Sequence, residues 1–284
     1  CPVNQRTTVH NMQKSALLVA GFCCLLIACE DVEQKAGERL LLARQALEAG
    51  QYDKAKTQID SIKILYPKAF EARRAGIYLM QDIELAEQQK TLAYLDSLLH
   101  IRQQEWEGCK DRFVLEKDTA YQQMGHYLAP SQVIEKNLHR SYLRFQTDER
   151  GAMSLTSIYC GTRNIHHTAV KVTAPDGTFA QTPTSKDSYE TSDLGEQIEK
   201  ADYKLGEDGG VIPFISQHRD QPLSITYLGD RTYSTTMARA DRQAAAEVYQ
   251  LSQLLSSLTQ IKKDMDEANR KINFIRENMK KRKE

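Results

Sequence analysis

The sequence predicts an α+β protein in which an antiparallel β domain is inserted between two long helices. Apolar residues recur every three or four positions before residue 113 and after residue 237, which is the period of a helix. Between these points they recur at every second position, which is the period of a strand, and turn-forming residues separate short segments. The predicted parts are residues 1–29, 30–69, 70–112, 113–237 and 238–284.

The first part has the form of a signal peptide. Residues 16–29 read ALLVAGFCCLLIAC without a charged residue, and Lys14 precedes them. A bilayer core needs about 20 apolar residues in helix, so this run is too short to span it comfortably and fits the apolar region of a signal peptide. Met12 is the expected start, because residues 1–11 have neither signal-like nor fold-like character.

The end of this run, Leu26, Ile27, Ala28 and Cys29, resembles the lipobox of bacterial lipoproteins. The resemblance implies diacylglyceryl attachment to the Cys29 sulfur, cleavage before Cys29 and acylation (palmitate, for example) of the new amine. More than one acyl chain gives a stable anchor, so the mature protein is expected to be lipid-anchored in an outer membrane. The alternatives are an ordinary signal peptide with a chance cysteine and a transmembrane anchor.

An acidic pair, Glu30 and Asp31, follows the predicted lipidation site. In some bacteria with two membranes such a stretch resembles a sorting tag for export to the cell surface. The pair is chemically equally suited to be the polar start of a tether. Surface exposure is the favoured interpretation, and the periplasmic face of the membrane remains the alternative.

Composition argues against a nucleic-acid partner. The whole chain has 38 basic and 38 acidic residues, and removal of residues 1–29 takes away two basic residues and no acidic one. The mature chain is therefore slightly acidic, whereas electrostatic binding of nucleic acid needs a basic surface.

Residues 36–69 predict two helices, broken at Gly50 and closed by Pro67. Their spacing resembles one tetratricopeptide repeat (TPR-like). The residues that carry the resemblance are Leu42 and Ala43 on the first helix, Gly50 and Tyr52 at the turn, Ala55 and Ile59 on the second helix, and Pro67. The pattern does not recur after Phe70, so a helical hairpin that caps the following helix is favoured over a peptide-binding groove.

Two proline-free segments predict the long helices. The apolar positions of the first are Leu79, Ile83, Ala86, Leu95, Leu99, Trp106, Cys109 and Phe113. Those of the second are Val248, Leu251, Leu255, Leu258, Ile261, Met265, Ala268, Ile272, Ile275 and Met279. This spacing is typical of a coiled coil. Since the two stripes have similar length, an antiparallel pair within one chain is favoured over pairing with a second copy.

The middle region predicts hairpins. Strands at 141–146 and 153–159 flank a turn at 148–151, and strands at 223–228 and 231–236 flank Gly229-Asp230. The segment 168–174 runs into the turn Pro175-Asp176-Gly177. Residues 181–210 are polar and glycine-rich, so loops and at most one short strand are expected there. Residues 211–218 fit a strand or a helical turn.

No catalytic, metal-binding or cofactor motif is found in the sequence, and no enzyme activity or cofactor is predicted. His166 and His167 are expected to point to opposite faces of a strand and not to share a metal. Asp193, Glu196, Glu199 and Asp202 recur at threes and are expected to form a solvated acidic helical face. Calcium binding is the weaker alternative, because the spacing is not that of an EF-hand.

Several other groups have structural interpretations. The tyrosines at 121, 127, 142, 159, 227 and 233 are expected to be strand residues, with carbohydrate binding as the less favoured alternative. Cys109 and Cys160 remain after processing, and free, half-buried thiols are favoured over a disulfide. The basic residues 280–283 suit a helix C-terminus, and contact with anionic lipid is the alternative.

Together these patterns predict a membrane-anchored lipoprotein with a structural or protein-interaction role, in which a helical stalk presents a β head. Its partners would be the lipid bilayer, through acylated Cys29, and an unidentified protein. The alternative is a binding component of an outer-membrane assembly or nutrient-uptake complex that works through the repeat-like helices.

Overall fold

The computed structural model describes residues 32–117 and 123–281, so Cys29, Glu30 and Asp31 lie outside the described residues. The chain combines helices with antiparallel sheets, which confirms the α+β class. It divides into two compact units: residues up to 95 with residues from 265 onward, and residues 96–264. The division falls inside both long helices and not at the ends of the predicted insert. In the described ranges, no helix has both the length and the apolar character to cross a membrane.

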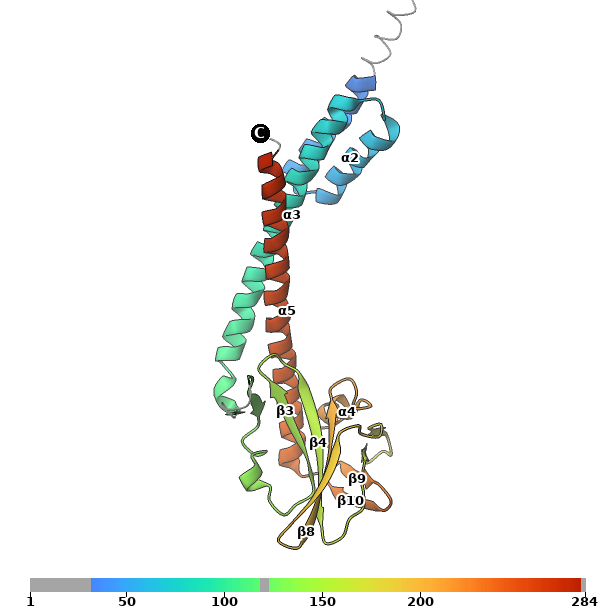
Figure 1. Ribbon diagram of the computed structural model, residues 1–284, viewed down its shortest axis with the longest axis vertical. Coiled ribbons are helices and arrows are strands. Elements are labelled where there is room, and N and C mark those ends of the chain that lie inside the picture. Colours follow the sequence, from blue (N-terminus) through green and yellow to red (C-terminus); the bar gives the residue numbers. More distant parts are fainter. Residues whose placement is uncertain (1–31, 118–122, 282–284) are drawn as a thin grey trace, which may run out of the picture. The chain divides into compact units, whose positions relative to one another are not determined.

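The first unit begins with a helix over residues 32–48, followed by α2 (Tyr52–Leu65) and the start of α3 (Phe70–Glu107) (Figure 1). Gly50 ends the first helix in the left-handed conformation, with φ of +68°. Residues other than glycine rarely adopt this backbone conformation. Pro67 follows the end of α2, where its ring cannot continue the helix. Both predicted helix breaks are therefore confirmed.

Small residues line the contact between these helices. One buried cluster contains Ala43, Ala46, Ala55, Ile59, Leu79 and Ile83, and another contains Ala36, Ile62, Ala69 and Ala72. The predicted packing role of Leu42 is wrong, because its side chain is 45% exposed. Ala36, Ala43 and Ala46 follow the helical spacing of seven and three, and Leu42 lies beside that stripe.

The C-terminal helix α5 (Arg239–Lys281) buries the apolar stripe that the sequence predicts. Buried members are Val248, Leu251, Leu255, Leu258, Ile261, Ala268, Ile272 and Ile275. Met265 and Met279 are half-buried. The first long helix is shorter than predicted: α3 ends at Glu107, and a short 3₁₀ helix η1 (Lys110–Arg112) follows it.

The second unit contains two antiparallel sheets. The larger has the order β1-β2-β3-β4-β8-β7, with bounds Val114–Glu116, His126–Leu128, Tyr142–Asp148, Met153–Gly161, Glu196–Lys204 and Ser188–Asp193 in that order. The smaller has the order β10-β9-β5-β6, with bounds Thr232–Thr236, Ser224–Leu228, Ala169–Thr173 and Phe179–Gln181. A 3₁₀ helix η2 (Ile134–Lys136) lies between β2 and β3.

The three predicted hairpins are confirmed as β3–β4, β5–β6 and β9–β10. The prediction for residues 181–210 is wrong, because β7 and β8 form a further hairpin there. Its turn contains Leu194 and Gly195, both with positive φ, as a tight hairpin turn requires. The predicted acidic helical face is therefore wrong as well. The segment at 211–218 is the helix α4 (Val211–Gln217).

The core of the second unit lies between the sheets, α4 and the first turns of α5 (Figure 1). Its largest members include Phe145 and Leu155 from the larger sheet, Ile225 and Tyr227 from the smaller sheet, Ile212 and Ile215 from α4, and Val248 from α5. The β3–β4 turn also contacts α5, where Ser256 Oγ donates to the Gly151 carbonyl at 3.1 Å. A Cβ at Gly151 would lie 2.3 Å from the Ser256 nitrogen, so only glycine fits.

Two further contacts attach α5 inside this unit. Leu251, Leu255 and Leu258 form a buried cluster, packed against Leu99, Trp106 and Phe113 among others. At the start of α5 the buried Asp241 carboxylate accepts two bonds from the Arg140 guanidinium, at 2.7 and 2.8 Å, and one from Gln132 at 2.8 Å. The segment before β3 is thus bound to the helix by a bidentate ion pair.

Candidate functional site

The Glu199 carboxylate, buried on β8, accepts four hydrogen bonds. Its Oε1 accepts from the backbone nitrogens of Ile165 and His166 at 2.7 and 2.9 Å. Its Oε2 accepts from the backbone nitrogen of His167 at 2.8 Å and from His167 Nδ1 at 3.0 Å. Burial by itself would raise the pKa of Glu199, but these hydrogen bonds to the charged form outweigh it and lower the pKa.

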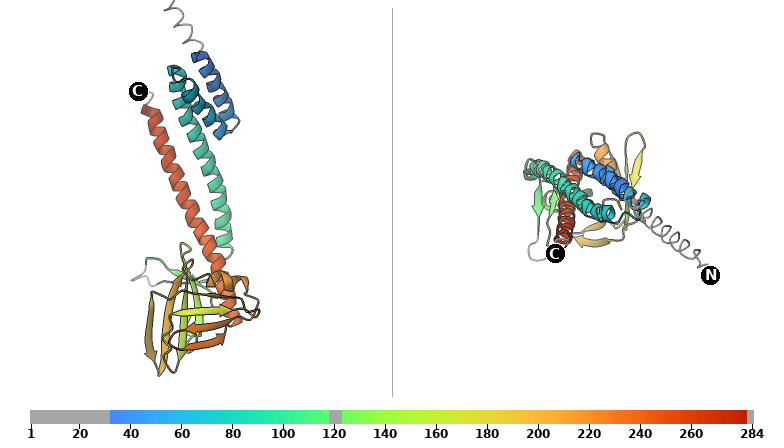
Figure 2. Two further views of the ribbon diagram at one scale, coloured as in Figure 1. Left: turned by 90° about the vertical axis from the view of Figure 1, so that its right-hand side faces the viewer. Right: turned by 90° about the horizontal axis from the view of Figure 1, so that it is seen from above.

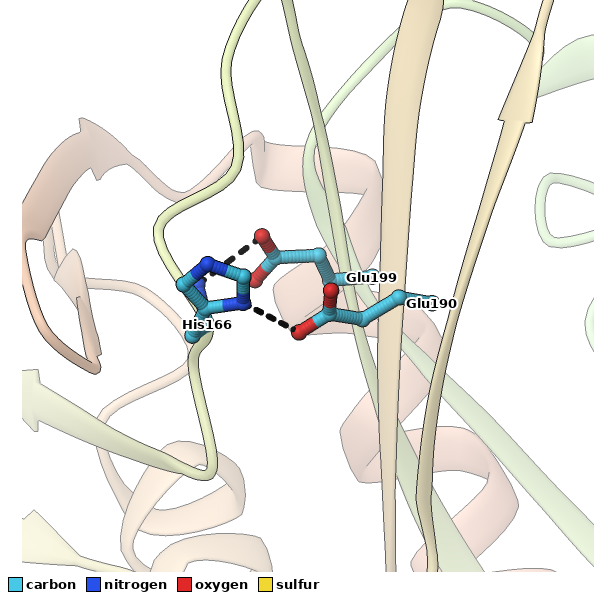
Figure 3. A group of neighbouring side chains, drawn as sticks. All are labelled: His166, Glu190 and Glu199. Atoms are coloured by element: carbon cyan, nitrogen blue, oxygen red, sulfur yellow. Dashed lines mark hydrogen bonds and ion pairs between the residues drawn. The ribbon is translucent and has the colours of Figure 1, made fainter.

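The two adjacent histidines have different surroundings, although they precede β5 in a loop and do not lie on a strand. His166 has φ of +56°, which turns its half-exposed ring to the surface. His166 Nδ1 lies 2.8 Å from Glu190 Oε1, and this partner raises the pKa of His166 (Figure 3). The His167 ring is fully buried, and burial lowers its pKa.

His166, Glu190 and Glu199 have ligand-type atoms within 4.8 Å of one another, which is close enough to share a metal ion (Figure 3). A carboxylate has about four lone-pair positions, and four hydrogen atoms already occupy those of Glu199. A cation at Glu199 would have to displace bonds to backbone nitrogens. His166 and Glu190 alone would give two ligands, fewer than the three or four that a zinc site uses. The donor set therefore fits a metal poorly.

Ser157, His167 and Glu199 form a hydrogen-bonded chain with the connectivity of a serine–histidine–acid triad. Ser157 Oγ lies 2.9 Å from His167 Nε2, and His167 Nδ1 lies 3.0 Å from Glu199 Oε2. With the proton on Nδ1, which donates to Glu199, the Nε2 atom of the neutral ring accepts the Ser157 hydroxyl hydrogen. These are the contacts that activate a serine nucleophile.

The hydrogen-bonded Ser157, His167 and Glu199 side chains are buried in the core of the second unit. Ser157 is fully buried, and His167 and Glu199 are buried to within a few per cent. The rings of Tyr159 and Tyr227 pack edge-on against His167, with centroids 6.4 and 5.3 Å away. A nucleophile must meet its substrate, and a hydroxyl without solvent exposure does not do so in this conformation. These hydrogen bonds instead connect β4, β8 and the loop before β5.

Sequence reasoning did not find this chain of residues. Ser157 and Glu199 lie on the paired strands β4 and β8, and His167 comes from the loop before β5. Their sequence separations are set by the lengths of connections and follow no motif. The spacing of Glu199 from the neighbouring acids indicates a helix and gives no sign of the contact with His167.

The described tyrosines do not form the carbohydrate-binding face that is the alternative interpretation of the sequence. Tyr142, Tyr159 and Tyr227 are buried and so offer no face to a sugar, which favours the expectation that they are strand residues in the core. Tyr233 and Tyr159 pack edge to face, 5.3 Å between centroids, and Tyr127 packs on Trp106 at 5.1 Å. Tyr121 lies outside the described residues.

Cys109 and Cys160 are free and half-buried, as favoured above. Burial and a hydrogen bond from the thiol to Glu196 raise the pKa of Cys160 to about 11, so this sulfur is not activated as a thiolate. Glu196 lies at the start of β8, Asp193 at the end of β7, and Asp202 further along β8, where it accepts a hydrogen bond from Thr156.

A different kind of feature lies between α2 and α3 in the first unit. A pocket of about 380 Å³ is lined by Ile59, Ile62, Gly76, Ile77 and Met80, with charged residues around them. Ile77 is 61% exposed at its edge. An apolar pocket with charged edges is suited to an amphipathic segment of another protein.

Comparison with protein-family models, with curated proteins and with solved structures finds no match for this chain.

Proposed function

We propose that this protein is a lipoprotein, anchored in an outer membrane through acylated Cys29, with an interaction role and no catalytic one. The observation that carries the proposal is the lipobox-like end of the apolar run, which stands three residues before the first described helix. A folded unit that begins so soon after an acylation signal is suited to a position at the membrane. The buried Ser157–His167–Glu199 chain supports a non-catalytic role, since its hydroxyl is out of reach of substrate.

Intact-mass measurement of the mature protein from membranes tests the anchor. We expect a chain that begins at Cys29 and carries acyl mass, and a Cys29→Ser variant that appears in the soluble fraction or remains an uncleaved precursor. A mature wild-type chain without acyl mass at Cys29 would refute the proposal.

We further propose that Glu30 and Asp31 direct the protein to the cell surface. Replacement of both by alanine should reduce protease cleavage of the protein on whole cells while the acyl mass stays unchanged. Equal cleavage of the variant and the wild type would leave the pair as a tether only.

In this proposal, α3 and α5 form an antiparallel coiled coil that presents the β strands to a partner. The packing of Leu255 and Leu258 with Leu99 and Trp106 supports it, because the two helices then bury their stripes against each other. Exposed apolar side chains on the β part, Phe179 and Leu194, are available for contact.

The second candidate function is binding of a partner by the TPR-like helices, and the pocket between α2 and α3 favours it. Cross-linking in native membranes with two matched variants separates the candidates. Ile77→Glu places a charge at the pocket, and Leu194→Glu places one at the β7–β8 turn. Loss of cross-links only in Leu194→Glu supports presentation by the β part, and loss only in Ile77→Glu supports the helical pocket.

A further inference from the structure

One end of the first unit exposes large apolar and basic side chains together. Ile64 and Leu65 end α2 with 73% and 56% of their surface exposed, and Phe70 begins α3 with 71% exposed. Lys68 and Arg74 are exposed beside them. We call these five residues the anchor-proximal tip.

The tip is fixed beside the start of the first described helix. Val32 packs against the buried cluster that contains Ala69 and Ala72, and the Ala72 backbone nitrogen donates to Glu33 Oε1 at 2.6 Å. Figures 1 and 2 both show the α2–α3 connection and the start of α3 at the same end of this unit as the start of the first described helix. The connection itself is closed by a bond from Arg73 Nη1 to the Pro67 carbonyl at 2.7 Å.

Chain length then limits where the tip can be in an anchored molecule. Two residues lie between Cys29 and Val32, and the three fully extended steps from one to the other reach only about 11 Å. Acyl chains on Cys29 would hold that residue at the membrane interface, so the start of the first helix, and the tip beside it, would lie at or near the lipid headgroups. This step depends on the proposed function.

We propose that the anchor-proximal tip is a second membrane contact, which binds phospholipid and prefers anionic headgroups. Ile64, Leu65 and Phe70 enter the boundary between headgroups and acyl chains, where exposed apolar side chains are stabilised. Lys68 and Arg74 pair with lipid phosphates.

The composition of the segment agrees with this contact. Residues 63–74 read KILYPKAFEARR, with four basic residues and a single acid, Glu71. Phe70 and Arg74 are one helical turn apart on α3 and therefore share a face, so apolar and cationic groups meet the same surface. Such a contact would fix the orientation of the first unit on the bilayer, which a flexible acyl tether by itself does not.

Vesicle sedimentation tests the inference on the unacylated chain from residue 30 to 284, which holds every described residue. The vesicles contain phosphatidylcholine alone or phosphatidylcholine with phosphatidylglycerol. We expect binding to the anionic vesicles that weakens with added salt. The double variants Ile64→Ser with Phe70→Ser, and Lys68→Gln with Arg74→Gln, should each lower the affinity about tenfold or more. Leu194→Ser, at an apolar residue of the β7–β8 turn that is 87% exposed and so more exposed than Ile64 or Phe70, should leave the affinity unchanged.

Thermal melting of each variant checks that folding is intact, as expected for exposed positions. No binding of the wild type to either vesicle, or equal binding of wild type and both double variants, would overturn the inference. So would a concentration-dependent dimer abolished by the same substitutions without vesicle binding, which would assign the tip to a second copy. Because the chain tested has no acyl group, its result is independent of the Cys29 mass measurement, and the two proposals can fail separately.

Discussion

The most informative single perturbation is removal of the Glu199 carboxylate by Glu199→Ala. The side chain is buried and accepts four hydrogen bonds, three from consecutive backbone nitrogens and one from the His167 ring. The substitution removes the acceptor and leaves four donors in the core without a partner.

The size of the effect follows from these contacts. A bond to a charged acceptor contributes about 1.5–3 kcal/mol, and an unsatisfied buried donor costs about 1–3 kcal/mol. A simple sum is too large, because the loop before β5 can relax and admit water. Four donors lose their acceptor and water satisfies part of them, so we expect about 3–5 kcal/mol for Glu199→Ala.

Glu199→Gln should cost less, since one amide oxygen remains as an acceptor for two of the four donors. The amide nitrogen then faces the His167 backbone N–H, and the His167 ring can move its proton to Nε2 so that Nδ1 accepts. Glu190→Gln is the matched control one strand away, where the carboxylate is exposed and paired only at the surface.

Urea unfolding of the chain from residue 30 to 284 measures these differences as free energies of unfolding. The expected order of destabilisation is Glu199→Ala, then Glu199→Gln, then Glu190→Gln. A loss below about 1 kcal/mol for Glu199→Ala would refute the idea that this carboxylate organises the second unit.

Three other predictions follow from buried groups. Folding lowers the pKa of His167 from 6.5 and that of Glu199 from 4.5, so at these two groups the unfolded chain binds more protons. Their contribution to stability should therefore fall on acidification, first below about pH 6.5 and then further through the acid range, whereas the raised pKa of His166 acts in the opposite direction. A His167→Gln variant with the same pH profile of unfolding as the wild type would contradict the assignment to His167. Leu258→Ala should cost about 2–5 kcal/mol, and the melting temperature should not depend on protein concentration if the coiled coil is within one chain; a melting temperature that rises with concentration would indicate pairing between copies. Tyr227→Phe should leave stability unchanged or increase it by about 1 kcal/mol, because the buried Tyr227 hydroxyl has no hydrogen-bond partner. Tyr203→Phe, which loses a bond to the Thr168 carbonyl at 2.8 Å, should destabilise in the same melts, and the opposite order would show that the Tyr227 hydroxyl is satisfied.

Local patterns in the sequence were sufficient for the elements that local physics dominates. Gly50 and Pro67 end helices because of their own backbone restrictions, and the structure has breaks at both. The stripe on α5 is buried because a helix with one apolar face must cover it. The turn at 175–177 closes a hairpin because its residues favour that backbone.

The β7–β8 hairpin was missed for a physical reason. Every residue of β7 is exposed, so the strand has no apolar alternation for a sequence pattern to report. Its pairing with β8 stabilises it, and β8 is in turn held by pairing with β4, which lies far away in the chain. The acids at 193, 196, 199 and 202 then matched a helical spacing by chance.

The sequence by itself determined the helix breaks, most hairpins and the apolar stripe of α5, and it provides the only basis for the proposed anchor at Cys29. The tertiary structure alone decided that Ser157, His167 and Glu199 form hydrogen bonds with one another and that all three side chains are buried. It also decided that Val32 and the tip at Phe70 lie at one end of the first unit. The reason is that capping, turns and periodicity act over a few residues, whereas burial and long-range hydrogen bonding depend on which strands and helices pair.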